Sequence, residues 1–468
     1  MLTEALIRVF GLSLTIVIAR ILGVEKFGLL NFAYALSSIC LVISDFGFER
    51  LTVREIARRS SRAAKFMSNI SAIKVILYMI MAGLCAGIVL WTPFSEKRLF
   101  VVLAVFMESA AQQHLLFVCS FFKAVQKMER EALIRSLLAF LLFLSGLGIL
   151  LAGLGLEGLV VSRVIISLLC LTLGLFWVSK EFKIQLAKVS WRYAKKLMKL
   201  SLPLAFYNIC VMIYLSINMV ILGFIRGNAA VGYYSASHKI IMLILVIPGA
   251  ISWASLPVLS INWQESFDSF KTTYQKSVRY LLLLAIPIAV GTFLLSKEGI
   301  MMLYGKDYLP SVALLCILVL CIIPDYLNHI FAVALISMNR QKTAVLSAIV
   351  GAVVAVLTSI IFIPRWGERG AAISFVLAML SVFLLQFIIV SRDFHLTIPL
   401  RIITRTTLAG AAMAVGILLL KKILTALPTL ISGSMVIYIG SLLILGEIKT
   451  NELKYACLLL YNVTKHKK

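Results

Sequence analysis

The sequence predicts an all-α integral membrane protein with about fourteen transmembrane helices. Hydrophobic residues make up 61% of the 468 residues and charged residues only 14%, whereas soluble proteins contain roughly 25% charged residues. The apolar residues form runs of about 20 residues, the length that crosses the hydrocarbon core of a bilayer as a helix. Short, often basic connections separate these runs, as in multi-pass membrane proteins.

Fourteen such runs follow one another along the chain. Connections that contain charged residues, glycine or proline separate them, and these residues commonly mark the ends of helices. The predicted spans are 4–22, 28–47, 69–90, 99–121, 132–152, 157–178, 200–223, 235–259, 279–296, 311–336, 343–363, 370–390, 405–422 and 429–446.

Lysine and arginine predict the orientation of the chain. With the N-terminus inside, thirty of the 45 basic residues fall on the inner side and ten on the outer side. Since positive residues concentrate on the cytoplasmic side, both termini are expected to be cytoplasmic. The same bias accounts for the net charge of +25 without a nucleic-acid partner.

The longest basic inner connection divides the chain into two six-helix lobes. The predicted parts are an N-lobe at 1–180, a basic linker at 181–199, a C-lobe at 200–391, two terminal spans at 392–446 and a cytoplasmic tail at 447–468.

Two pairs of glycines repeat at nearly one offset, which favours pseudo-symmetric lobes. Tight loops that simply need glycine remain the alternative. The pairs are Gly23 and Gly28 against Gly227 and Gly232, at an offset of 204 residues, and Gly155 and Gly158 against Gly367 and Gly370, at 212.

Five basic residues fall inside predicted spans, where a charge costs at least about 2.5 kcal/mol at the helix centre. Such a charge usually faces a cavity or a partner, so these residues are the candidates for binding a substrate. Those near span ends, Arg20 and Lys74, could instead extend to the membrane surface. The five are Arg8, Arg20, Lys74, Arg163 and Lys239.

Three acidic residues are candidates for binding a coupling ion, Na⁺ or H⁺. Asp325 follows Pro324 in mid-span, where a backbone carbonyl freed by the proline could help to bind the ion; a salt bridge is the rival interpretation. Glu108 also lies deep in a span. Asp45 shares a helix face with Glu49 beside a basic run, and structural pairing there is the alternative.

The segment 54–59, at the inner side, could belong to an interfacial helix that holds anionic lipid head groups.

The sequence shows no nucleophile elbow, phosphate-binding loop or zinc motif, so neither an enzyme nor a metal or other cofactor is expected.

The segment Ala19–Gly28 resembles the motif after the first helix of polysaccharide flippases, and Asp45-Phe46-Gly47 with Arg54-Glu55 resembles their next motif. The turn Gly367–Gly370 also fits the sequence pattern of these flippases. The chain is therefore similar to the Wzx-like polysaccharide-transporter branch of the multidrug/oligosaccharidyl-lipid/polysaccharide exporter superfamily.

This resemblance implies export of a polyprenyl-diphosphate-linked oligosaccharide, such as an O-antigen, capsule or exopolysaccharide unit, by alternating access. It further implies a bacterial or archaeal cytoplasmic membrane, ion-gradient coupling, membrane lipids and glycan polymerases as partners, and cavity cations that hold the diphosphate. Arg8 and Lys239 fall in helices that resemble those carrying such cations in related flippases. The alternatives are a drug/cation antiporter of the same superfamily and a membrane glycan polymerase or ligase.

Overall fold

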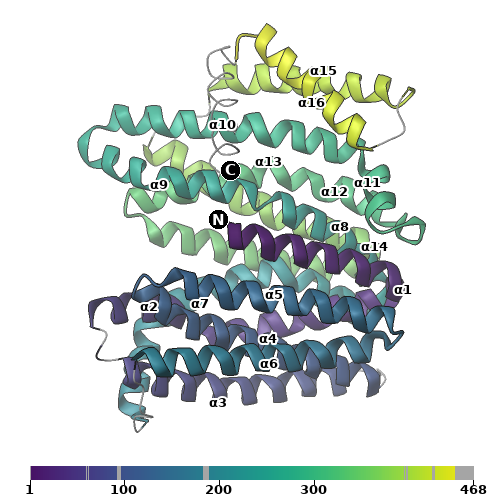
Figure 1. Ribbon diagram of the computed structural model, residues 1–468. Helices are drawn as coiled ribbons and strands as arrows, with labels where there is room; N and C mark the ends of the chain where they lie inside the picture. Colours follow the sequence, from purple (N-terminus) through teal and green to yellow (C-terminus); the bar gives the residue numbers. More distant parts are fainter. Residues whose placement is uncertain are drawn as a thin grey trace, which may run out of the picture. The chain divides into compact units, whose positions relative to one another are not determined.

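The computed structural model describes residues 2–447, apart from 60, 62, 92–95, 183–188, 395, 397–398 and 424–426. Within these residues every regular element is a helix (Figure 1). Most of the predicted tail, residues 448–468, and part of the predicted basic linker lie outside the described residues.

The helices follow the predicted spans closely. Their bounds are α1 Leu2–Asp45, α2 Phe48–Arg58, α3 Ala63–Leu90, α4 Glu96–Ala124, α5 Met128–Leu151, α6 Gly155–Phe182, α7 Trp191–Ile225, α8 Gly227–Ile244, α9 Ile247–Glu265, α10 Phe267–Leu294, α11 Ser296–Leu303, η2 Lys306–Tyr308, α12 Ser311–Leu318, η3 Val319–Cys321, α13 Ile322–Ser337, α14 Gln341–Phe394, α15 Leu400–Leu420 and α16 Leu427–Ile444.

Twelve helical stretches of the described residues are long and apolar enough to cross a membrane. Two of them, 53 and 54 residues long, would measure about 80 Å if straight, against about 30 Å of hydrocarbon. Each is broken by a glycine with non-helical backbone, Gly23 (φ 73°) in α1 and Gly367 (φ 57°) in α14. Each therefore holds two spans, and the predicted all-α membrane fold of about fourteen spans is confirmed.

Two predicted spans are broken helices. The span at 235–259 consists of α8 and α9, which separate just before Pro248, and the span at 311–336 consists of α12, η3 and α13, which separate just before Pro324. Proline removes one helical hydrogen bond and clashes with the preceding turn, so both breaks have a local cause.

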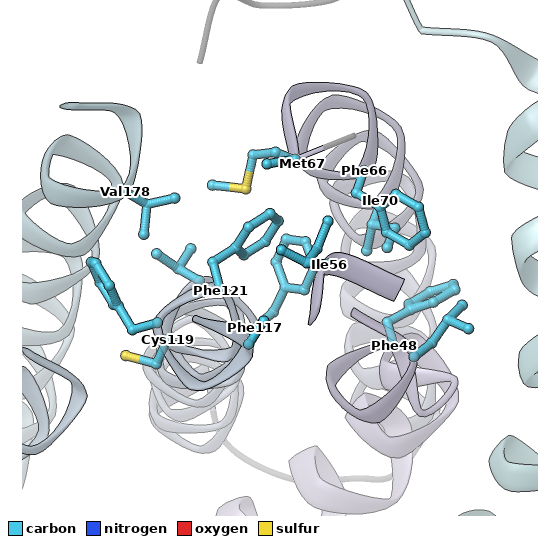
Figure 2. Packing of buried hydrophobic residues seen from close by; sticks show 14 of the residues in the cluster. Phe48, Ile56, Phe66, Met67, Ile70, Phe117, Cys119, Phe121 and Val178 are labelled. Atoms are coloured by element: carbon cyan, nitrogen blue, oxygen red, sulfur yellow. The ribbon is translucent and has the colours of Figure 1, made fainter. Parts of the chain in front are cut away.

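The chain forms two compact units. The first contains residues 1–235 and 351–375, and the second contains residues 236–350 and those from 376 onward. In the first unit α4 packs against α1, α2, α3, α5 and α6. Figure 2 shows part of its apolar core, where Ile56 from α2 lies beside Phe117 and Phe121 from α4.

Helix α2 is an amphipathic helix that immediately follows the end of α1. Its buried side chains Phe48, Leu51 and Ile56 recur at helical spacing and join the core of the first unit. Arg54 and Arg58 are exposed on the opposite face. A helix with one apolar and one basic face is typical of a membrane interface.

In the second unit the last two helices pack against each other and against α10 (Figure 1). At one end of this contact, Lys421 pairs with Glu298 at 2.7 Å. At the other end, the buried carboxylate of Glu447 accepts a hydrogen bond from Arg279 at 3.0 Å and lies 3.7 Å from Arg405. Charge pairs therefore hold the terminal helices to α11 at one end and to α10 at the other.

The two copies of the first glycine repeat contact each other inside the first unit. A Cβ atom on Gly28 would lie 1.8 Å from the carbonyl oxygen of Asn228, and one on Gly232 would lie 2.2 Å from that of Val24. Only glycine permits backbones to approach this closely. The repeat glycines are therefore needed where the start of α8 meets the second half of α1.

Replacing Gly28 with alanine should destabilise the protein, because the added methyl group meets backbone atoms that cannot rotate away. We expect the Gly28→Ala and Gly232→Ala variants to lose about 1–3 kcal/mol or more, measured as a lower thermal unfolding midpoint in detergent. Gly11→Ala in α1 is the control, since its Cβ would meet no atom within 4 Å. Equal midpoints for Gly28→Ala and Gly11→Ala would contradict the close contact.

Candidate functional site

Helix α4 carries a row of polar side chains through the first unit. Glu108 and His114 are buried, although the helix is apolar enough to span a membrane. Because buried polar groups without partners cost free energy, each must find one on a neighbouring helix. The contacts of these side chains define two clusters of charged residues.

The first cluster is centred on the carboxylate of Glu108, which is 1% exposed. It accepts hydrogen bonds from the hydroxyl of Tyr34 at 2.6 Å, from Gln112 at 2.9 Å and from Nε of Arg163 at 2.9 Å. Gln112 also donates to Ser167 at 3.2 Å. This carboxylate therefore joins α1, α4 and α6 and compensates the charge of Arg163.

The second cluster is centred on Lys74 of α3, whose side chain is fully buried. Its ammonium group donates to Oδ1 of Asp45 at 2.8 Å, and the Asp45 side chain is 23% exposed. Beside this pair, Ser71 forms a hydrogen bond of 3.3 Å with Nε2 of His114. Asp45 is the last residue of α1, and the next residue, Phe46, has a left-handed backbone with φ 46°.

Two further cations bind α4 to its neighbours at its two ends. Lys123 pairs with Glu49 of α2 at 2.7 Å and with Glu131 of α5 at 3.1 Å. The guanidinium of Arg98 lies 4.1 Å from the ring centre of Phe32, a cation–π contact. The sequence placed Asp45 and Glu49 on one helix face. In the structure Asp45 pairs with Lys74, whereas Glu49 pairs with Lys123.

The other predicted cations lie elsewhere. Arg8 and Arg20 are exposed on the first half of α1, 12 residues apart and thus about 18 Å along the helix. Lys239 is half-buried in α8 and belongs to the second unit. Among the five predicted cations, the structure therefore places Lys74 and Arg163 inside carboxylate pairs and leaves Arg8 and Arg20 at the surface of α1.

Asp325 lies in the first turn of α13, directly after Pro324. Its Oδ2 atom lies 3.6 Å from Nε2 of His329, one turn further along. Among the described residues, none donates a hydrogen bond to Oδ2 of Asp325 or to Oδ1 of the buried Asn328. Residues three apart share a helix face, and Pro324 cannot donate to the carbonyl of Leu320. These oxygen atoms have the chemistry that Na⁺ or a proton requires.

Several residues of these clusters escaped the sequence analysis. Tyr34 carries no signal, because a tyrosine among apolar residues is common in membrane helices. Gln112, Gln113 and His114 form three consecutive polar residues inside an apolar span, and that run could have indicated a buried polar cluster. Asn328 could have been found as the residue one turn after Asp325.

Two family models match the chain. One, described as Polysaccharide biosynthesis protein, matches residues 1–263, and the other, described as Lipid II flippase MurJ, matches residues 137–440. Each match covers more than half of the 468 residues.

Similar proteins occur in bacteria and archaea. A Shigella flexneri protein named as an O-antigen transporter is 25% identical over 395 residues, which cover 79% of this chain and 91% of that protein. A Haloferax volcanii protein named as a low-salt glycan biosynthesis flippase is 22% identical over 368 residues, covering 76% of this chain and 74% of that protein.

Solved structures share the fold. The lipid II flippase MurJ in an inward closed conformation superposes with a TM-score of 0.73 at 17% identity, covering 97% of this chain and 98% of MurJ. An inward-facing multidrug resistance MATE family transporter of the MOP superfamily gives a TM-score of 0.65 at 14% identity, covering 82% of this chain and 94% of the transporter.

The Glu108 cluster should be needed for stability. Glu108→Gln would leave the guanidinium of Arg163 buried beside a neutral amide, which we expect to cost about 3–5 kcal/mol. Adding Arg163→Met removes that isolated charge, so the double variant should be more stable than the sum of the single effects predicts. The coupling is measured from the free energies of unfolding of the native protein, Glu108→Gln, Arg163→Met and the double variant. Glu25→Gln, at an exposed position of α1, is the control. Additive effects would argue against the ion pair.

Proposed function

Because the chain belongs to the polysaccharide biosynthesis protein family, and to that of the lipid II flippase MurJ, we propose that it moves a polyprenyl-diphosphate-linked oligosaccharide across the membrane. The family membership confirms the resemblance found in the segment Ala19–Gly28 and makes the chain a multi-pass membrane transporter of polysaccharide biosynthesis rather than an enzyme. The oligosaccharide would be an O-antigen, capsule or exopolysaccharide unit.

Exposed cations on apolar helices are the structural feature that favours this substrate. Arg8 and Arg20 are accessible on α1, and Lys239 is partly accessible on α8. Guanidinium and ammonium groups form strong, charge-assisted hydrogen bonds with phosphate oxygens. Arg163 and Lys74 are enclosed with Glu108 and Asp45. We therefore propose that Arg8 and Arg20 of the first unit and, separately, Lys239 of the second unit are the cations available to contact the diphosphate, and that Arg163 and Lys74 stabilise the bundle.

The direction of transport would be from the cytoplasmic to the outer leaflet of a cytoplasmic membrane. The supporting observation is the excess of basic residues in the inner connections, which also favours cytoplasmic termini. Binding of the substrate would have to alternate between the two sides of the membrane, as in other transporters built from repeats. Glycan polymerases that use the flipped unit are the expected partners.

An ion gradient would drive the cycle through Asp325. Glu108 and Asp45 already have cationic partners at 2.8 Å, so binding a further cation there would compete with a lysine or an arginine. Among the described residues, no group donates a hydrogen bond to Oδ2 of Asp325 or to the amide oxygen of Asn328, three residues further along α13. This pair of oxygens supports Asp325 as the residue that binds Na⁺ or a proton.

A drug antiporter of the same superfamily is the rival function. Its cationic substrates would need accessible carboxylates. In the first unit, Glu108 is buried against Arg163, and Asp45 is bound to Lys74. The pairing of these two carboxylates with cations favours an anionic substrate over a cationic drug.

Flipping of a fluorescent polyprenyl-diphosphate oligosaccharide in reconstituted vesicles tests the proposed substrate. Arg8→Ala and Lys239→Ala should each slow flipping by about tenfold or more, because each removes a charged hydrogen bond to the diphosphate. Lys26→Ala, at an exposed position further along α1, should leave the rate unchanged. Unchanged flipping in both test variants would remove these cations from the substrate site, and absence of flipping by the native protein would refute the function.

The same assay with an imposed Na⁺ or proton gradient tests the coupling site. Native flipping should accelerate with one of the two gradients, whereas Asp325→Asn should flip at a rate that no longer depends on it, because the amide cannot bind the ion as a carboxylate does. Asp307→Asn, at an exposed position, is the matched control. Retained gradient dependence in Asp325→Asn would place the coupling ion elsewhere.

A further inference from the structure

A cavity of about 730 Å³ lies between the start of α5 and the end of α6, inside the first unit. It is separate from the Glu108 and Lys74 clusters, and the proposed transport cycle does not use it. Its lining combines charged and apolar side chains, which is unusual for a site that binds either a free ion or a purely apolar molecule.

Three cations line the charged part of this cavity. Lys127 and Arg130 both pair with the carboxylate of Glu181, and Lys180 precedes that carboxylate in the chain. The side chains of Lys127 and Arg130 are 45% and 42% exposed. Together with Glu129, the lining contains three cations and two carboxylates. The shared carboxylate holds two cations in place, and the net charge of the cavity is positive.

The apolar part of the cavity is formed by Leu133 from α5 and by Phe176 and Trp177 from α6. Leu133 and Phe176 are 55% and 59% exposed. Side chains this exposed on a membrane-spanning helix face lipid rather than protein. Tryptophan is enriched where the hydrocarbon meets the head groups, so Trp177 marks that level.

Each helix continues this apolar surface away from the cavity. On α5, exposed Phe140 and Leu144 follow Leu133 at intervals of seven and four residues, and on α6, exposed Ile165 and Leu169 precede Phe176 at intervals of four and seven. Intervals of four and seven keep side chains on one face of a helix. Two lipid-facing stripes therefore end at a cluster of cations.

We propose that this cavity binds the phosphate head group of an anionic phospholipid, whose acyl chains lie along the stripes of α5 and α6. The cations Lys127, Arg130 and Lys180 complement the phosphate charge, and the apolar lining requires that the phosphate be attached to a lipid. The ends of α5 and α6 at the cavity belong to the side that carries the basic connections, so the lipid belongs to that leaflet. Bulk phospholipid is the amphiphile that surrounds every membrane-spanning helix.

Tryptophan quenching by lipids with brominated acyl chains tests this proposal on the full-length protein in bilayers. At equal mole fraction, brominated phosphatidylglycerol should quench the tryptophan fluorescence more than brominated phosphatidylcholine does. This excess quenching by the anionic lipid should disappear in Trp177→Phe. Lys180→Gln should weaken the preference for the anionic lipid by about fivefold, as expected for one cation near a lipid phosphate. Lys195→Gln, at an exposed position of α7, should leave the preference intact.

Three outcomes would overturn the assignment. An equal quenching by both lipids would mean that the cavity does not select an anion, and an excess that persists in Trp177→Phe would place the anionic lipid elsewhere. Loss of the excess on addition of inorganic phosphate or a polyprenyl diphosphate would assign the cavity to a small anion or to the transported lipid, respectively. A triple variant that combines Lys127→Gln, Arg130→Gln and Glu181→Gln removes two of the three cations together with the carboxylate that they share, and it should also lose the excess quenching.

Discussion

The helical bundle of the first unit depends on ion pairs between buried side chains. Because the surroundings of these helices contain little water, each buried charge needs a partner of opposite charge. The carboxylate of Glu108 meets this need for Arg163, and that of Asp45 meets it for Lys74. Each pair joins helices that are far apart in the sequence. Their relative positions are therefore fixed by directional charge pairs as well as by apolar packing, which by itself distinguishes poorly between alternative contacts of lipid-facing helices.

This pairing is the basis on which the proposed function distinguishes cations that stabilise the bundle from cations that bind the diphosphate. A cation that is buried beside a carboxylate cannot bind a diphosphate without displacing that carboxylate, whereas the side chain of an exposed cation is accessible to one. Arg163 and Arg8 are both arginines in predicted spans, but Arg163 is enclosed with Glu108, whereas Arg8 is exposed on α1. The same reasoning favours Asp325 over Glu108 as the residue of the proposed coupling site, since Asp325 retains an oxygen atom that accepts no hydrogen bond among the described residues.

The glycine repeat has a physical role as well as a topological one. Gly28 and Gly232, which occupy matching positions in the two copies, permit the backbones around them to touch. A side chain at either position would prevent this contact. The repeat in the sequence thus corresponds to a real contact in the first unit, and tight turns alone explain only Gly23 and Gly227, whose backbones have positive φ values.

The sequence by itself determined the all-α membrane fold, the number of spans and most of their bounds, because about 20 apolar residues in a row have no other stable arrangement in a bilayer. It also showed the family, through a local motif around Gly23. It revealed which residues carry charge inside spans, but not which of them are neutralised. Only the tertiary structure decided that Lys74 meets Asp45 and that Arg163 meets Glu108. These contacts join residues 29 and 55 positions apart, and no periodicity along one helix specifies which face of another helix it will meet.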